Sequence, residues 1–213
     1  LTEEDKNNYL KNLKIKGKID YIYNPMESVE IKNCNINSKQ IVSVGRLTYQ
    51  KGFDILCDVA KDVLSKNPDY KWIILGDGED KEKLQSKIKE YNLQDRLILK
   101  GKVSNVEDYY ENSSLYVMTS RFEGLPMTLL EAKSYKMPIV SFDCPTGPSE
   151  IVRNNINGYL VKANDIKEMS NKVNSVLLDD KKLKKFSDKA ELDIDKFNIN
   201  SIINKWTNIL CTI

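Results

Sequence analysis

The chain has 213 residues, of which 40% are hydrophobic, and this is enough for one large α/β domain with a substantial core. Its 33 Lys and Arg residues nearly balance 31 Asp and Glu residues, and a net charge of +2 provides no uniform field for nucleic acid or an anionic membrane. The sequence contains no histidine, which excludes the usual zinc sites, a Ser-His-Asp triad and the commonest general base. Any chemistry must therefore use carboxylates, cations or backbone groups, and we expect no nucleic-acid partner.

The cysteines and the apolar runs indicate where the protein works. Cys34, Cys57, Cys144 and Cys211 are far apart and form no CxxC pair, which fits a reduced, cytoplasmic setting. The apolar runs are strand-sized, far below the roughly 20 residues that span a bilayer, so we expect a soluble protein. The chain begins at Leu1 without a signal-peptide pattern, and we interpret it as a piece of a longer protein.

Short apolar runs alternate with longer amphipathic segments, without an internal repeat. A capped first helix is predicted from Thr2 and the acidic residues at 3–5. A strand is predicted over 18–25, ending at Asn24 and Pro25, and a polar loop over 26–39. The further predicted strands are 40–45, 71–76, 96–101, 114–119, 137–143 and 158–161, and the further predicted helices are 53–66, 79–91, 105–112, 126–136, 147–153 and three within 165–210.

Strands that are apolar on both faces and separated by helices predict a mainly parallel sheet covered on each side, a Rossmann-like three-layer αβα domain. In such a sheet, ligands bind beyond the carboxyl ends of the strands, where helix N-termini offer free N–H groups. Three motifs each follow a predicted strand directly, so we expect them to meet at this edge.

The first motif is "GRLTYQKG" at 45–52. Gly45 permits a close backbone approach, while Arg46 and Lys51 place two cations beside the end of a strand, a pair suited to a diphosphate. Ordinary solvated surface charge is the alternative interpretation of both cations.

The second motif, "GDGE" at 76–79, resembles part of a dinucleotide-binding fingerprint, but Lys81 stands where the third glycine would be. A turn before a helix is the simpler interpretation, and it gives these glycines a structural role.

The third motif, "EGLPMTLLEA" at 123–132, carries two carboxylates. Pro126 suits the first position of a helix, which places Glu123 in the preceding loop and Glu131 in the second helical turn. Helical side chains lean toward the N-terminus, so both carboxylates can reach one ligand and accept hydrogen bonds from vicinal hydroxyls. The alternative is that Glu131 pairs with Lys133 or Lys136, or faces solvent.

Two further segments have simpler explanations. In "DCPTGPSEIV" at 143–152, the prolines and Gly147 predict a turn, with Thr146 or Ser149 as a cap for the next helix. Asp179 and Asp180 lie between predicted helices and are interpreted as a solvated loop rather than as a metal site, so we predict no metal.

Taken in order, the motifs at 45–52, 76–79, 123–132 and 143–152 resemble the C-terminal, donor-binding half of a GT-B glycosyltransferase of family 4. The resemblance covers roughly residues 18–190. It implies a retaining enzyme that transfers a hexose from a nucleotide diphosphate sugar, with UDP favoured, to an acceptor hydroxyl. It also implies no cofactor and a role in bacterial surface polysaccharide synthesis.

The resemblance assigns roles to individual residues. Arg46 and Lys51 match the diphosphate-binding cations, Glu123 matches the acid that contacts the donor sugar, and these three are the expected catalytic residues. Glu131 matches the ribose-binding acid, and Glu150 is expected near the donor cleft without being a main contact. The full expected donor site comprises Gly45, Arg46, Lys51, Gly76, Lys102, Val103, Glu123, Gly124, Leu125, Met127 and Glu131, with Lys102 and Val103 at the base.

The resemblance also implies a domain organisation. Residues 1–17 are expected to be the trailing segment of an absent N-terminal domain that supplies a glycan or lipid-linked acceptor, 18–190 the donor-binding domain, and 191–213 a C-terminal helical segment. That segment is expected to pack toward the absent domain, which would expose Ile202, Ile203, Trp206 and Leu210 here; packing on their own domain is the alternative. The full-length enzyme could associate peripherally with the inner face of the membrane.

Other functions remain open. A nucleotide-binding module without turnover fits the same residues, and so does another GT-B enzyme. An epimerase would need histidines that are absent, and a phosphorylase would need a cofactor lysine that is not evident. A dinucleotide dehydrogenase fits least, because its glycine fingerprint is incomplete.

Overall fold

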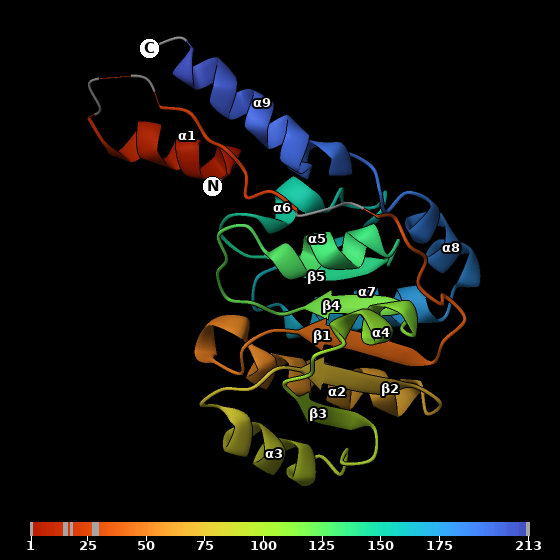
Figure 1. Ribbon diagram of the computed structural model, residues 1–213. Coiled ribbons are helices and arrows are strands. Elements are labelled where there is room, and N and C mark those ends of the chain that lie inside the picture. The colour runs from red at the N-terminus through yellow and green to blue at the C-terminus, as the bar shows by residue number, and fades with distance from the viewer. Residues whose placement is uncertain (1, 15–16, 18, 27–29, 212–213) are drawn as a thin grey trace.

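Six parallel strands form a single sheet in the order β3-β2-β1-β4-β5-β6 (Figure 1). The computed structural model describes residues 2–14, 17, 19–26 and 30–211. The strands are β1 (Gln40–Val44), β2 (Lys71–Leu75), β3 (Leu97–Gly101), β4 (Leu115–Met118), β5 (Ile139–Asp143) and β6 (Gly158–Lys162). The helices are α1 (Glu3–Asn12), η1 (Tyr49–Lys51), α2 (Phe53–Lys66), α3 (Lys81–Glu90), α4 (Val106–Glu111), α5 (Met127–Ser134), α6 (Pro148–Ile151), α7 (Ile166–Leu177), α8 (Asp180–Asp188), η2 (Ile194–Phe197) and α9 (Ile199–Leu210).

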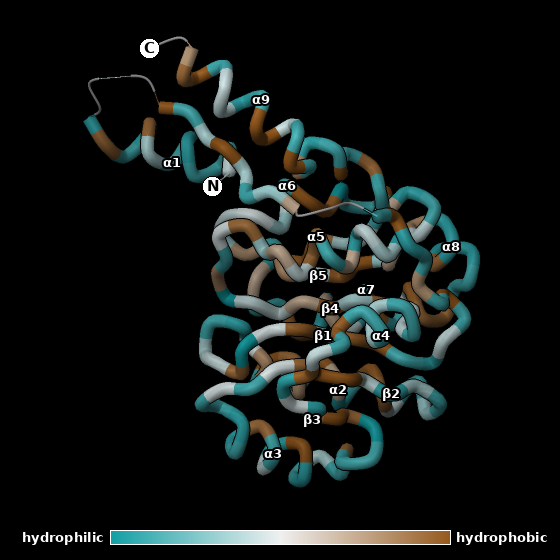
Figure 2. Tube along the Cα trace, in the orientation of Figure 1, coloured by the Kyte–Doolittle hydropathy of each residue, from teal (hydrophilic) through white to brown (hydrophobic). Residues whose placement is uncertain are grey.

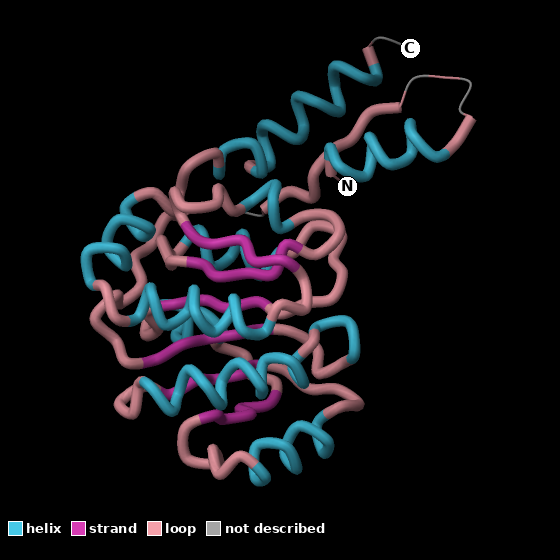
Figure 3. Tube along the Cα trace, turned by 180° about the vertical axis from the view of Figure 1, so that it is seen from behind, coloured by secondary structure: helices cyan, strands magenta, loops and turns pink. Residues whose placement is uncertain are grey.

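Alternation along each strand divides the core into two layers, because successive side chains point to opposite faces. Ile41 on β1 packs with α2 and α7, whereas its neighbour Val42 packs with α4 and α5. The sheet is therefore buried on both faces, as the apolar runs predicted. Figure 3 shows helices over the face of the sheet opposite to that of Figure 1, and Figure 2 shows the hydrophobic colouring of the strands.

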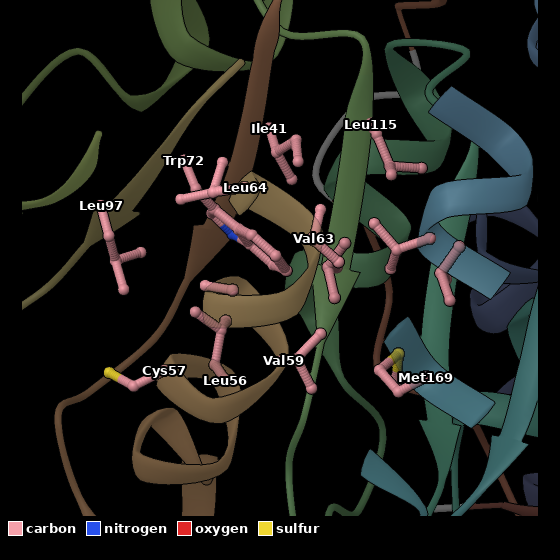
Figure 4. Close-up of a cluster of buried hydrophobic side chains, with 14 of the residues drawn as sticks. Ile41, Leu56, Cys57, Val59, Val63, Leu64, Trp72, Leu97, Leu115 and Met169 are labelled. Carbon is pink, nitrogen blue, oxygen red and sulfur yellow. The ribbon is translucent and has the colours of Figure 1, made fainter. Parts of the chain in front are cut away.

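Trp72 lies at the centre of the layer beneath α2, among Leu56, Val63 and Leu64 (Figure 4). Its indole N–H would cost free energy if left unpaired there, and it donates to Ser43 Oγ at 3.0 Å. The Ser43 hydroxyl in turn donates to the Val117 carbonyl at 2.7 Å. This buried chain of hydrogen bonds joins β2, β1 and β4, the strands beside the candidate site.

Most predicted elements are confirmed, with ends shifted by one or two residues. Thr2 caps α1 as expected, accepting from the Asp5 N–H at 3.0 Å. Pro126 is the N-cap of α5 rather than its first residue. Asp179 lies between helices, but it caps α8 by accepting from the Lys182 N–H at 3.0 Å and is not part of a simple loop.

The predicted strand at 18–25 is wrong. Residues 19–25 belong to no strand, and Met26 forms only an isolated bridge with Asn198. The segment packs its aromatic side chains instead: Tyr23 lies 4.7 Å from Phe197 between ring centroids. The alternating apolar side chains of this segment are therefore buried by packing on the domain, and no neighbouring strand pairs with its backbone. Residues 1, 15, 16, 18, 27–29, 212 and 213, which fall within the predicted terminal segments, strand and loop, lie outside the described residues.

α1 and α9 both lie at one end of the molecule, beyond α6, and the segment that carries Tyr21 runs between them, with Tyr21 against Lys6 of α1 and Lys205 of α9 (Figures 1 and 3). Of the stripe predicted on α9, Ile202 is buried against its own domain, whereas Ile203, Trp206 and Leu210 are 52%, 52% and 65% exposed. The stripe is thus split between the two expected outcomes. No helix in the part of the chain that the structure describes is long and apolar enough to cross a membrane.

Candidate functional site

The strand order reverses between β1 and β4, which are hydrogen-bonded neighbours through Ile41–Leu115 and Val42–Tyr116. The loops that leave their carboxyl ends diverge, because β1 leads toward one side of the sheet and β4 toward the other. In doubly wound sheets, this divergence creates the crevice in which ligands bind. The first and third motifs follow these two strands.

The loop after β1 brings Lys51 back over the end of the strand. A Cβ at Gly45 would lie 3.3 Å from both Cγ and Cδ of Lys51, tighter than an ordinary contact, so a glycine leaves room for the lysine stem. Lys51 ends the short helix η1, and its side chain is 17% exposed. Arg46 is exposed beside it, and no partner among the described residues forms an ion pair with its guanidinium.

Glu123, in the loop after β4, meets Lys51 across the crevice. Its Oε1 lies 2.7 Å from Lys51 Nζ and accepts a hydrogen bond from Ser120 Oγ at 2.6 Å. The Glu123 side chain is only 6% exposed, and two donors compensate its charge. Lys51 carries three N–H donors, so it can hold Glu123 and still donate to a second anion.

A pocket of about 390 Å³ opens beside this pair, at the carboxyl ends of β1, β2 and β3. Its lining comprises Val44, Gly45, Arg46, Leu75, Gly76, Asp77, Lys102, Val103 and Val106. Apolar walls together with two cations, Arg46 and Lys102, suit a flat, partly polar ligand group attached to an anion. All five residues expected at this end of the donor site line the pocket: Gly45, Arg46, Gly76, Lys102 and Val103.

Glu131 lines a second and larger pocket of about 660 Å³, between α4 and α5, which shares Val106 with the first. Its Oε2 accepts a hydrogen bond from the Tyr110 hydroxyl at 2.7 Å. Burial, with Tyr116 and Glu131 nearby, holds the pKa of Tyr110 well above its usual value, so the hydroxyl remains a donor. Met127, from the first turn of α5, lines the same pocket.

The structure contradicts the alternative that Glu131 pairs with a neighbouring lysine. Lys133 is buried and donates to the Ile151 carbonyl at 3.1 Å, while Lys136 pairs with Glu191 at 3.6 Å. Half-buried Glu131 therefore keeps one carboxylate oxygen oriented by Tyr110 and faces the pocket.

The turn around Gly124 completes the site. The Thr146 hydroxyl donates to the Glu123 carbonyl, and the Glu123 N–H donates to the Pro145 carbonyl at 3.4 Å. Thr146 or Ser149 was expected to cap α6; the N-cap of α6 is Gly147 and no side chain caps it. Leu125 is buried at 7% exposure, and its side chain belongs to the core layer that contains α4 and α5.

The expected residues thus fall into three adjoining groups: the pair Lys51–Glu123 with Gly124 and Leu125, the lining of the smaller pocket, and Glu131 with Met127. Sequence reasoning missed Tyr110 and Ser120, which orient the two carboxylates. Ser120 lies three residues before Glu123 in a loop, a signal that could have been noticed; Tyr110 gives no such signal, because its contact depends on the packing of α4 against α5. Within the described ranges, no three His, Cys, Asp or Glu side chains gather in a way that could hold a metal ion.

Comparison with known proteins agrees with this arrangement. Residues 27–193 match the family described as "Glycosyl transferases group 1". The amylovoran biosynthesis glycosyltransferase AmsD of Erwinia amylovora is 35% identical over 220 residues, which cover 99% of this chain and 60% of that protein. The poly(ribitol-phosphate) alpha-N-acetylglucosaminyltransferase of Staphylococcus aureus is 32% identical over 195 residues, or 90% of this chain and 40% of that protein.

A crystal structure of a variant of S. aureus TarM with UDP, alpha-GlcNAc-glycerol and fondaparinux superposes with a TM-score of 0.85 at 29% identity, covering 98% of this chain and 42% of that one. The chain thus spans 60% or less of the length of these relatives. The fold is a three-layer α/β domain of the kind found in GT-B glycosyltransferases. The polar residues of the candidate site lie in the loops after β1 and β4, where the strand order reverses. The chain belongs to the group 1 glycosyl transferase family.

Proposed function

We propose that the chain binds a nucleotide diphosphate sugar, with a UDP-sugar favoured, as the donor half of a retaining hexosyltransferase of family 4. One observation carries this proposal: cations and acids from separate motifs adjoin one another at the carboxyl edge of the sheet, with Lys51 Nζ 2.7 Å from Glu123 Oε1 beside the smaller pocket. The UDP bound to TarM supports the choice of nucleotide.

In this proposal, each part of the donor has its own partner. The base enters the smaller pocket by Lys102 and Val103, and the ribose hydroxyls donate to Glu131. The diphosphate lies between Arg46, Lys51 and the free N–H groups at the start of α5, and the sugar hydroxyls donate to Glu123. Gly76 and the backbone of Gly124 allow the close approach.

The proposed chemistry follows from this placement. As the bond between the sugar and the diphosphate breaks, negative charge grows on the departing phosphate oxygen. Arg46, Lys51 and the N-terminus of α5 stabilise that charge as fixed positive groups, and the proposal needs neither metal nor cofactor. The oxygen of a glycan or lipid-linked acceptor hydroxyl then bonds to the sugar with retention of its configuration, and the hydroxyl proton passes to the departing diphosphate.

The names of the relatives support a place in the synthesis of bacterial surface polysaccharides, for AmsD acts in amylovoran biosynthesis. We also propose that the enzyme works in the cytoplasm, at the inner face of the membrane. Binding of the donor without turnover is the competing function for the chain as it stands, and an assay of donor hydrolysis and transfer distinguishes the two.

The proposal is tested by calorimetry with UDP, GDP and ADP and with their sugars. We expect saturable binding of UDP and a UDP-sugar. Lys51→Ala or Arg46→Ala should weaken UDP binding by roughly 1.5 to 3 kcal/mol, the scale of a hydrogen bond to a charged group. Lys71→Ala is the matched control, because Lys71 is exposed at the opposite end of β2. Absence of binding by all these nucleotides, or equal losses in all three variants, would refute the assignment.

A further inference from the structure

Glu150 on α6 forms contacts that the donor site does not explain. Its Oε1 accepts from the backbone N–H groups of Glu3 and Glu4 at 3.0 and 3.4 Å, and its Oε2 accepts from the Tyr23 hydroxyl at 2.6 Å. The first N–H groups of a helix lack partners within the helix, and their positive end favours a carboxylate. Glu150, 12% exposed, therefore caps α1 from a distant part of the chain.

Two lysines hold the short helix that carries Glu150. Lys196 Nζ donates to the Glu150 carbonyl at 2.8 Å, and Lys133 Nζ donates to the Ile151 carbonyl at 3.1 Å. These are carbonyls at the end of α6, which would otherwise be unpaired. Burial lowers the pKa of both lysines, which indicates that each is held in a poorly solvated position. The backbone beneath Glu150 is thus fixed on two sides.

The segment just before Glu150 is hydrogen-bonded to the loop that carries Glu123. The Thr146 hydroxyl donates to the Glu123 carbonyl, and the Pro145 carbonyl accepts from the Glu123 N–H. Gly147 has φ +97°, and a Cβ there would lie 2.4 Å from the Gly124 carbonyl oxygen. Residues 145–150 therefore touch Glu123 and Gly124 at one end and α1 at the other.

From these contacts, we infer that Glu150 is a positioning residue that couples occupancy of the donor site to the anchoring of α1. The inference rests on the proposed function, since it requires a donor that contacts the Glu123–Gly124 turn. A ligand that fixes this turn also fixes Pro145, Thr146 and Gly147, and through them the carboxylate that caps α1. Coupling free energies are reciprocal, so a firmly capped α1 should in turn strengthen donor binding.

The test measures amide hydrogen exchange by mass spectrometry in the whole chain, with and without the UDP-sugar that binds most tightly among UDP-glucose, UDP-galactose and UDP-N-acetylglucosamine. In the wild type, saturation should slow exchange in α1 (Glu3–Asn12) by at least about fivefold, the lower end of typical coupling. Glu150→Gln preserves size and should abolish this ligand-dependent slowing; Tyr23→Phe, which removes one donor to Glu150, should reduce it.

Lys6→Met is the matched control, because it breaks a separate side-chain anchor of α1, the Lys6–Asp20 ion pair of 3.3 Å, without touching Glu150. It should loosen α1 equally with and without ligand, leaving the slowing intact. If the donor binds but exchange in α1 is unchanged, or if Glu150→Gln retains the slowing, the coupling is refuted. If calorimetry detects no donor binding, the proposed function fails, and the coupling fails with it.

Discussion

Lys133 lies two residues after Glu131 on α5 but points into the protein, where its side chain is 1% exposed and donates to the Ile151 carbonyl. A buried ammonium loses its hydration, so burial lowers the pKa of Lys133 to about 8. Its charge is therefore a cost in the folded state near neutral pH. That cost is the consequence of holding the end of α6 with a cation rather than with a neutral donor.

This shift predicts a pH dependence that belongs to one residue. The folded pKa of about 8 lies below the roughly 10.4 of a free lysine, so between these values the unfolded chain binds more protons. The free energy of unfolding of the wild type, relative to Lys133→Met, should then rise with pH from 8 to 10, by at most about 1.4 kcal/mol per unit. Urea titrations at several pH values measure this difference. Lys71→Met provides the control, and a difference that stays flat for Lys133→Met would contradict the prediction.

At the same scale, the sequence predicted the acids and cations of the site but not what orients them. Glu123 and Lys51 were predictable because each lies in the connection that follows a strand, and parallel strands end at one edge. Their mutual ion pair of 2.7 Å was not predicted, because the path of Lys51 over Gly45 depends on the turn η1. The contacts of Tyr110 and Glu150 were not predicted for a related reason: their partners are distant in sequence, at Glu131 and at the start of α1.

Among the elements, the turn after β2 shows why a glycine-rich motif can be structural. Gly76 has φ +136°, and a Cβ there would lie 1.9 Å from the Gly45 carbonyl oxygen. The loops after β1 and β2 can thus lie against each other, and the Leu47 N–H donates to the Asp77 carbonyl at 3.0 Å. The simple interpretation of "GDGE" as a turn before a helix is confirmed. The predicted strand at 18–25 failed because periodicity alone cannot show whether a neighbouring strand is available.

We predict that Gly76→Ala destabilises the protein much more than Gly101→Ala. Both glycines have positive φ, but a Cβ at Gly101 would meet open space. Gly101→Ala should therefore lower the free energy of unfolding by roughly 1 to 2 kcal/mol, the cost of a positive φ for a residue with a Cβ. Gly76→Ala should lower it by at least about 2 kcal/mol more, because β1 and β2 must separate. Urea denaturation followed by circular dichroism measures both. Equal losses would show that the close approach at Gly76 is not needed.

For the whole molecule, the central claim is that one ligand extends along the carboxyl edge of the sheet, from the smaller pocket to Glu123. The strand order explains this placement, since β1 and β4 are neighbours at the centre of the sheet and the loops that leave their carboxyl ends diverge. The fold and the parallel sheet followed from the alternation of apolar runs and helices, and the edge at which we place the site follows from them. The chemistry of the ligand is a proposal that rests on the side chains at this edge.

Calorimetry with UDP and with the matching UDP-sugar, on Glu131→Ala and Glu123→Ala, tests this claim most directly. Glu131→Ala should weaken binding of both ligands by roughly 1.5 to 3 kcal/mol, because the ribose is common to them. Glu123→Ala should weaken binding of the UDP-sugar alone and leave the affinity for UDP within about twofold, since Glu123 is proposed to contact only the sugar and its loss also leaves Lys51 free for phosphate. Equal losses of UDP affinity in the two variants would contradict the account.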